Sequence, residues 1–90
     1  MRYFFSEDRY GNTLSFNDIH NHYGEETIAF YIEQMRYGDA NEPFNYAEGI
    51  LPSGKFTRVF GFSPSELDSL YDYVIRNADL MFEIAREKVV

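Results

Sequence analysis

The feature that most constrains the fold is a long amphipathic helix expected at the C-terminal end of the chain. Ser63 is a favoured N-cap residue, Pro64 suits the first helical position, and Glu66 completes a capping box three residues after the cap. Apolar residues then recur at helical spacing and form one stripe: Leu67, Leu70, Tyr71, Val74, Ala78, Met81 and Ala85. The sequence predicts a helix from Pro64 to about Lys88, whose stripe the rest of the chain must cover.

This helix carries more apolar surface than one stripe. At ~1.5 Å per residue it would be about 37 Å long, whereas a domain of this size has a radius of gyration of about 13 Å. Tyr73, Leu80 and Ile84 fall beside the stripe and widen it. Either the helix is central and covered on two sides, or its end packs against a second copy of the chain. For the second case we predict a dimer interface at Tyr73, Leu80 and Ile84.

Turn residues indicate two β-hairpins. Gly11-Asn12 marks a turn between strands expected at 1–5 and 13–15. The segment Pro52-Ser53-Gly54-Lys55 marks a second turn, between strands expected at 46–51 and 56–62.

Between the hairpins, helical signals predict shorter helices. Ser15 followed by Asp18 resembles a weak capping box, which predicts a short helix over Phe16–His22. Apolar residues at helical spacing predict another helix from Glu25 to a cap at Gly38. We therefore expect a single α+β domain over residues 1–90. In it, a small antiparallel sheet of two hairpins, with three or four strands, packs against the long C-terminal helix and a shorter helix.

The composition argues against several classes of function. Fifteen Asp and Glu against eight Lys and Arg give a net charge of −7, which opposes binding to nucleic acid or to an anionic membrane and favours basic partners. The chain has no cysteine, so disulfides and zinc–thiolate sites are excluded. No apolar run approaches the roughly 20 residues of a membrane span, and the first residues do not resemble a signal peptide. We expect a cytoplasmic protein.

Catalytic and metal-binding motifs are weak in this sequence. Asp18, His20 and His22 are the grouping that most resembles a metal site, but residues two apart point in different directions on a helix, so the histidines could converge only on a strand or turn. No serine lies in a G-x-S-x-G elbow, and the segment 49–55 lacks the glycine spacing of a phosphate loop. We predict a binding protein with no enzymatic activity, no cofactor and no metal. A small metal-dependent enzyme is the least favoured alternative.

The acids of the C-terminal helix form the most suggestive pattern. Five of them lie within ~100° of arc opposite the core stripe, and neighbours three or four residues apart are about 5–6 Å from each other: Asp68, Asp72, Asp79, Glu83 and Glu87. Such a ridge of carboxylates can imitate a phosphate backbone, although helices commonly carry charge on their solvent face. We predict that the following acids contact a basic partner: Glu25, Glu26, Glu33, Asp68, Asp72, Asp79 and Glu83. The turn carrying Lys55 and Arg58 is the one basic segment, where an acidic ligand could dock.

Three features together resemble a known kind of protein. They are the aromatic start Met1-Arg2-Tyr3-Phe4-Phe5, the acidic first half and the long acidic helix; residues 1–52 hold nine acids and three bases, a net charge of −6. The chain is similar in these respects to small acidic proteins of phages and mobile elements, including anti-CRISPR inhibitors and immunity-type proteins. That resemblance implies a protein that occupies the basic surface of a nuclease or CRISPR effector. The alternative is a homodimeric structural or regulatory domain of a mobile element, without catalytic activity.

Overall fold

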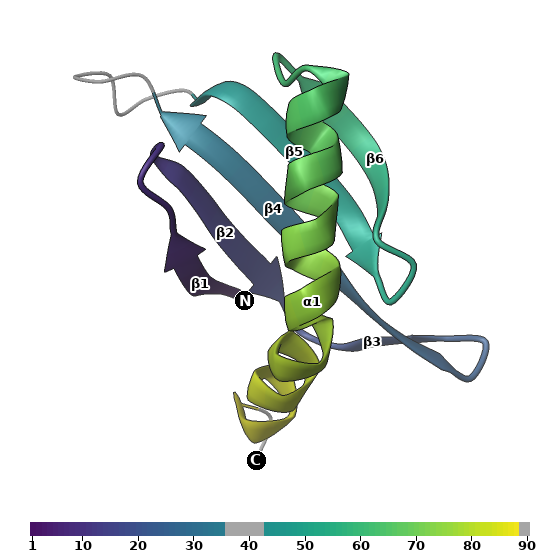
Figure 1. Ribbon diagram of the computed structural model, residues 1–90. Helices are drawn as coiled ribbons and strands as arrows, with labels where there is room; N and C mark the ends of the chain where they lie inside the picture. Colours follow the sequence, from purple (N-terminus) through teal and green to yellow (C-terminus); the bar gives the residue numbers. More distant parts are fainter. Residues whose placement is uncertain (36–42, 89–90) are drawn as a thin grey trace.

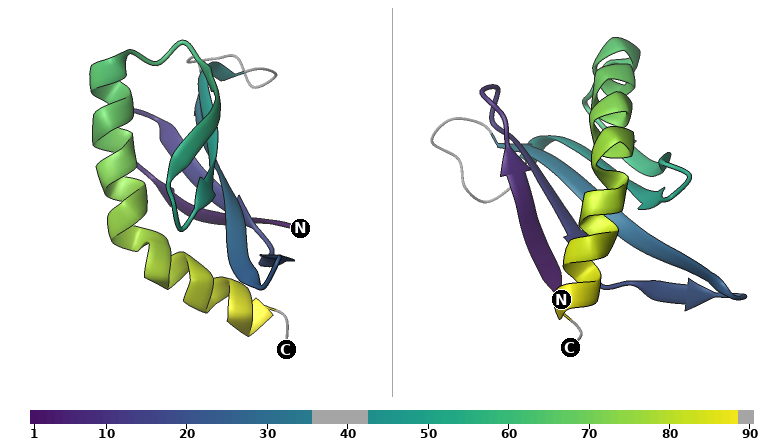
Figure 2. Two further views of the ribbon diagram at one scale, coloured as in Figure 1. Left: turned by 90° about the vertical axis from the view of Figure 1, so that its right-hand side faces the viewer. Right: turned by 60° about the horizontal axis from the view of Figure 1, so that its bottom comes forward.

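The computed structural model describes residues 1–35 and 43–88, which form one sheet and one helix (Figure 1). The elements follow one another as β1 (Arg2–Glu7), β2 (Asn12–Asn17), β3 (His20–His22), β4 (Glu25–Met35), β5 (Pro43–Leu51), β6 (Lys55–Phe60) and α1 (Pro64–Lys88). The helix lies across one face of the sheet, so the molecule has two layers (Figure 2). The predicted α+β class and the predicted helix from Pro64 to Lys88 are confirmed.

The sheet is antiparallel, with strand order β1-β2-β4-β5-β6, and the short β3 pairs with the beginning of β4. Both predicted hairpins are present, as β1–β2 and β5–β6. The sheet has six strands among the described residues, more than the three or four expected. The additional strands are β3 and β4, which come from the segment between the two hairpins. Strand β4 joins the hairpins into one sheet, because it pairs with β2 on one side and with β5 on the other.

The prediction of shorter helices between the hairpins was wrong. Residues 16–22 contribute the end of β2 and all of β3, and residues 25–35 form β4. In β4 the buried residues Ile28, Phe30 and Ile32 alternate with more exposed neighbours, which is the period of a strand with one face on the core. Gly38, the predicted cap, lies outside the described residues.

The core lies between α1 and the face of the sheet that it covers. It is built from side chains that point inward from β2, β4 and β5, from Phe62, and from the helix: Leu14, Phe16, Ile28, Phe30, Ile32, Ala47, Leu51, Phe62, Val74, Ala78, Met81, Phe82 and Ala85. Most of the predicted helix stripe is therefore in the core or packed against it, with Leu67 and Leu70 half-buried at its edge. We call the opposite face of the sheet, which α1 does not cover, the open face.

The helix is anchored over the sheet by contacts at both sides. On one side it approaches the β5–β6 turn so closely that a Cβ on Gly54 would come within 2.6 Å of Ile75 Cδ1. On the other side the hydroxyl groups of Tyr73 and Ser6 share a hydrogen bond of 2.8 Å. The helix bends near its middle (Figure 2), in the region where the Asn77 amide donates to the Tyr73 carbonyl at 2.8 Å. The bend keeps the second half of the helix on the sheet.

The helix begins with the capping box that the sequence predicts. The Glu66 N–H donates to Ser63 Oγ at 3.2 Å, and the Ser63 N–H donates to Glu66 Oε1 at 2.9 Å. Two of the N–H groups at the start of the helix, which have no intrahelical partner, are satisfied in this way.

We expect the substitution Ser63→Ala to lower the free energy of unfolding by about 1 kcal/mol, because it removes the acceptor for the Glu66 N–H. Chemical denaturation followed by circular dichroism measures this. Ser65→Ala, on the same turn but outside the cap, should leave stability nearly unchanged. Equal effects of the two substitutions would contradict a specific role of the cap.

Candidate interaction surfaces

Four of the predicted partner-binding acids meet at one end of the molecule. Glu25 and Glu26 open β4, and Asp79 and Glu83 lie on the second half of α1, more than 50 residues away in sequence. They line a shallow cleft of about 650 Å³, which we call the acidic cleft; its walls are Gly24, Glu25, Glu26, Pro52, Asp79, Phe82, Glu83 and Arg86. An ion pair between Glu26 on β4 and Arg86 on α1, with a distance of 2.9 Å, joins this strand end to the second half of the helix.

The acidic cleft carries a clear excess of negative charge. Its lining has four acids and one base, so its formal charge is 1 − 4 = −3. The base, Arg86, is engaged by Glu26 through an ion pair of 2.9 Å. Both side chains are about half exposed, and such surface pairs contribute under ~1 kcal/mol to stability. Outside this pair, the lining of the cleft includes the acids Glu25, Asp79 and Glu83.

The other three predicted acids lie elsewhere. Asp68 and Asp72 are exposed on the first half of α1 and continue the row of carboxylates away from the cleft. Glu33 points to the open face, where it forms an ion pair of 3.1 Å with Arg2. The structure thus places six of the seven on the helix or at the adjoining strand end and separates Glu33 from them by the sheet.

The open face combines aromatic rings with balanced charge. Phe4 and Phe60 are 66% and 65% exposed, and the Arg2 guanidinium stacks over the Tyr31 ring, 3.8 Å from its centroid. Over β1, β2, β5, β6 and the part of β4 that pairs with β2 and β5, the strand register places three bases and three acids on this face: Arg2, Lys55, Arg58, Glu7, Glu33 and Glu48. Their formal charges cancel. Beside the basic turn predicted from Lys55 and Arg58, the neighbouring strand carries one acid, Glu48, in register with Arg58.

One tyrosine of the open face has a perturbed ionisation. Burial raises the pKa of the Tyr46 phenol to about 12, and the hydrogen bond that it donates to Glu48 Oε2 at 3.0 Å acts in the same direction. Both effects favour the neutral phenol, so this side chain remains a hydrogen-bond donor throughout the neutral range.

The three residues predicted as a dimer interface are exposed to different degrees. Leu80 is 47% exposed, Tyr73 is partly exposed and bonded to Ser6, and Ile84 is half-buried against the chain's own core. Leu80 is the member of this set with the most apolar surface available to a second copy.

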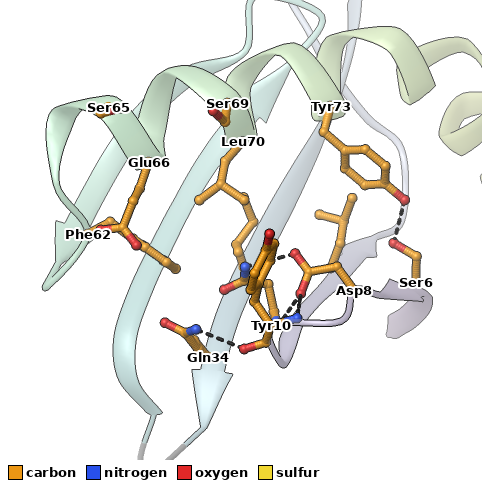
Figure 3. A pocket seen from close by; sticks show the side chains of 13 residues that line it. Ser6, Asp8, Tyr10, Gln34, Phe62, Ser65, Glu66, Ser69, Leu70 and Tyr73 are labelled. Carbon is orange, nitrogen blue, oxygen red and sulfur yellow. Dashed lines mark hydrogen bonds between the residues drawn. The ribbon is translucent and has the colours of Figure 1, made fainter.

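A pocket that sequence patterns did not indicate lies under the first half of α1 (Figure 3). We call it the helix–hairpin pocket; its volume is about 470 Å³, and it lies between the helix and the β1–β2 turn. Its walls are Ser6, Asp8, Tyr10, Asn12, Leu14, Ile32, Gln34, Phe62, Ser65, Glu66, Ser69, Leu70 and Tyr73. Asp8 orders the turn by accepting hydrogen bonds from the N–H groups of Tyr10 and Asn12 at 2.8 and 2.9 Å.

The two histidines lie on a strand instead of the helix end that was predicted. His20 and His22 are exposed on β3. Asp18 is engaged elsewhere: it accepts hydrogen bonds from the Tyr3 hydroxyl and from the N-terminal ammonium group. The bond from Tyr3, with that from the N-terminus, lowers the pKa of Asp18 below its ordinary value. Within residues 1–35 and 43–88, no group of three or more His, Asp or Glu side chains is arranged to hold a metal ion.

No protein-family model matches the chain, and neither a curated protein nor a solved structure is significantly similar to it. In the described part of the chain, the helix is not apolar enough along its length to cross a membrane.

Proposed function

We propose that this chain is a small acidic binding protein that occupies a basic surface of a nucleic-acid-handling protein. The observation that carries the proposal is the acidic cleft, where carboxylates from β4 and from α1 converge although the sequence separates them widely. The row of acids along α1 extends this surface through Asp72 to Asp68. The chain acts by binding, with no reaction of its own.

A nuclease or CRISPR effector is the class of partner that this surface fits. Such proteins bind nucleic acid largely through Lys and Arg that neutralise phosphates. Carboxylates spaced by one helical turn, about 5–6 Å, present repeated negative charge to the same basic groove. Occupation of that groove would exclude the nucleic acid, which is the action of an inhibitor. Opposite charges would also speed the encounter of the two proteins.

We expect reversal of the acids in the cleft to slow association with the partner. Asp79→Lys combined with Glu83→Lys should reduce the association rate constant at least tenfold at low salt, since electrostatic steering raises such rates by about 10–1000-fold. The measurement is biosensor kinetics at two salt concentrations, with the immobilised chain probed by purified CRISPR effectors and nucleases that carry basic grooves.

The matched control is Asp68→Lys combined with Asp72→Lys, which makes the same change in net charge outside the cleft. A smaller effect of this control locates the contact at the cleft. Equal slowing by both double variants would instead show that the partner contacts the whole row of acids along α1. Binding that responds neither to salt nor to either reversal would contradict the proposal.

A second candidate function is a homodimeric structural or regulatory domain. The observation that favours it is the exposure of large apolar side chains outside the acidic surface, at Leu80 on the helix and at Phe4 and Phe60 on the open face. If this candidate is correct, the wild type is a dimer by light scattering. Either Leu80→Glu or Phe60→Glu then yields a monomer, and the effective variant identifies the face that pairs. A wild type that stays monomeric at high concentration contradicts this candidate.

A further inference from the structure

The helix–hairpin pocket has the size and the floor of a small-molecule site. Its volume of about 470 Å³ falls within the range of about 300–1,000 Å³ that is usual for ligand pockets. Core residues Leu14, Ile32 and Phe62, together with Leu70, give it an apolar interior. An apolar ring or chain placed there would be removed from water, which is favourable in proportion to the area buried.

The rim of the pocket is acidic. Asp8 approaches from the β1–β2 turn and Glu66 from the helix, so carboxylates stand on opposite walls (Figure 3). The described residues that line the pocket include no Lys, Arg or His. Glu66 uses Oε1 for the helix cap. Its second carboxylate oxygen has no hydrogen-bond partner among the described residues. The rim therefore favours a cationic ligand and disfavours an anionic one.

The wall of the pocket also contains an unpaired acceptor. The Asn12 Oδ1 atom is shielded from water and has no hydrogen-bond partner among the described residues, while its Nδ2 donates to Asp8 Oδ2 at 2.8 Å. An unpaired buried acceptor is costly, so a rearrangement that brings a donor to it would be favourable.

We propose that the helix–hairpin pocket binds a small cationic amphiphile, with an aromatic or aliphatic body on the apolar floor and a protonated amine at the rim between Asp8 and Glu66. This site is separate from the acidic cleft and does not depend on the function proposed for it. The amine donates hydrogen bonds to the rim carboxylates, and the body lies over Leu14 and Ile32.

Three indole probes that differ only in their head group test this proposal. They are tryptamine, which is cationic, tryptophol, which is neutral, and indole-3-acetate, which is anionic. The chain contains no tryptophan, so indole fluorescence reports on the probe alone. We expect tryptamine to bind at least about tenfold more tightly than indole-3-acetate, with tryptophol between them. Amide signals of Leu14 and Ile32 should shift in NMR spectra on addition of tryptamine.

Variants locate the site. Ser69→Phe, on the exposed helix surface at the mouth, should abolish binding of all three probes by filling the pocket. Glu66→Gln keeps the capping box but removes the rim charge, so it should weaken tryptamine about two- to fivefold and leave tryptophol unchanged. Asp68→Asn makes the same charge change outside the pocket and should alter neither. Equal affinities for tryptamine and indole-3-acetate, binding that survives Ser69→Phe, or no binding of any probe would each overturn the proposal.

Discussion

Replacing Phe30 by alanine should lower the free energy of unfolding by about 3–5 kcal/mol, the usual cost of deleting a large buried aromatic side chain. The ring is fully buried at the centre of β4 and packs edge-on against Phe56, with the two centroids 5.8 Å apart. Domains of this size have total stabilities of about 5–15 kcal/mol, so the variant should be close to unfolding. Denaturation in urea, followed by circular dichroism, measures the loss.

Phe60→Ala is the matched control. It removes the same atoms from β6, but Phe60 points to the open face and is 65% exposed. Surface substitutions of this kind usually change stability by less than about 0.5 kcal/mol. A loss at Phe60 as large as that at Phe30 would mean that the open face is buried in solution, for example by a second copy of the chain. Similar small losses at both positions would contradict a core in which the Phe30 ring is fully buried.

The parts of the fold that the sequence predicts correctly are those set by local signals. The cap at Ser63 and the stripe that follows it depend on residues within one helix. The two hairpin turns likewise depend on glycines with positive φ, at Gly11 and Gly54, which few other residues tolerate. In each case the determining residues lie within a few positions of the element that they set.

Strand β4 was mispredicted because its local signals are ambiguous. Ile28, Tyr31 and Ile32 fit a helical period, while Ile28, Phe30 and Ile32 fit a strand period equally well. The outcome depends on partners distant in sequence, since β4 gains hydrogen bonds from β2 and β5 along most of its length. A central strand in a sheet is stabilised by such tertiary pairing, which a single sequence window does not contain.

The candidate sites also divide into features set by local sequence and features set by tertiary contacts. Helical periodicity placed Asp79 and Glu83 on one exposed face, as the structure has them. Their approach to the beginning of β4 is a tertiary contact, seen in the Glu26–Arg86 ion pair, so no pattern in the helix could have indicated the cleft. The helix–hairpin pocket was missed for a related reason. It is a space between two layers, and its lining comes from segments throughout the chain.

The charged residues of the open face are balanced, whereas the surface formed by α1 is acidic. The chain has a net charge of −7, and the six charged residues of the open face sum to zero. Among the described residues, acids in excess of bases lie at the acidic cleft and along α1. Electrostatic steering of a basic partner would accordingly present the helix side of the molecule to it, and not the aromatic sheet face.

We expect Gly49→Ala to destabilise the protein by about 3 kcal/mol, at the upper end of the usual cost of overpacking a core. A Cβ at this position would lie 2.5 Å from Phe30 Cζ and 2.6 Å from the backbone oxygen of Lys55. The phenyl ring can shift a little, but the Lys55 oxygen belongs to the paired strand β6, next to an irregularity in the β5–β6 register. Relief of this contact requires the two strands to separate locally. Thermal or urea unfolding gives the change in stability.

Gly11→Ala provides the comparison, because a Cβ on Gly11 would contact nothing within 4 Å and only its positive φ is unfavourable to alanine. That strain should cost about 1 kcal/mol. A double-mutant cycle with Phe30→Leu then separates the two contacts at Gly49. If the phenyl ring is the main obstacle, Gly49→Ala should cost much less in the Phe30→Leu background. If the Lys55 oxygen dominates, the cost should stay nearly the same in both backgrounds, as the rigidity of the β5–β6 backbone leads us to expect. A Gly49→Ala variant as stable as the wild type would show that β5 and β6 do not approach each other this closely.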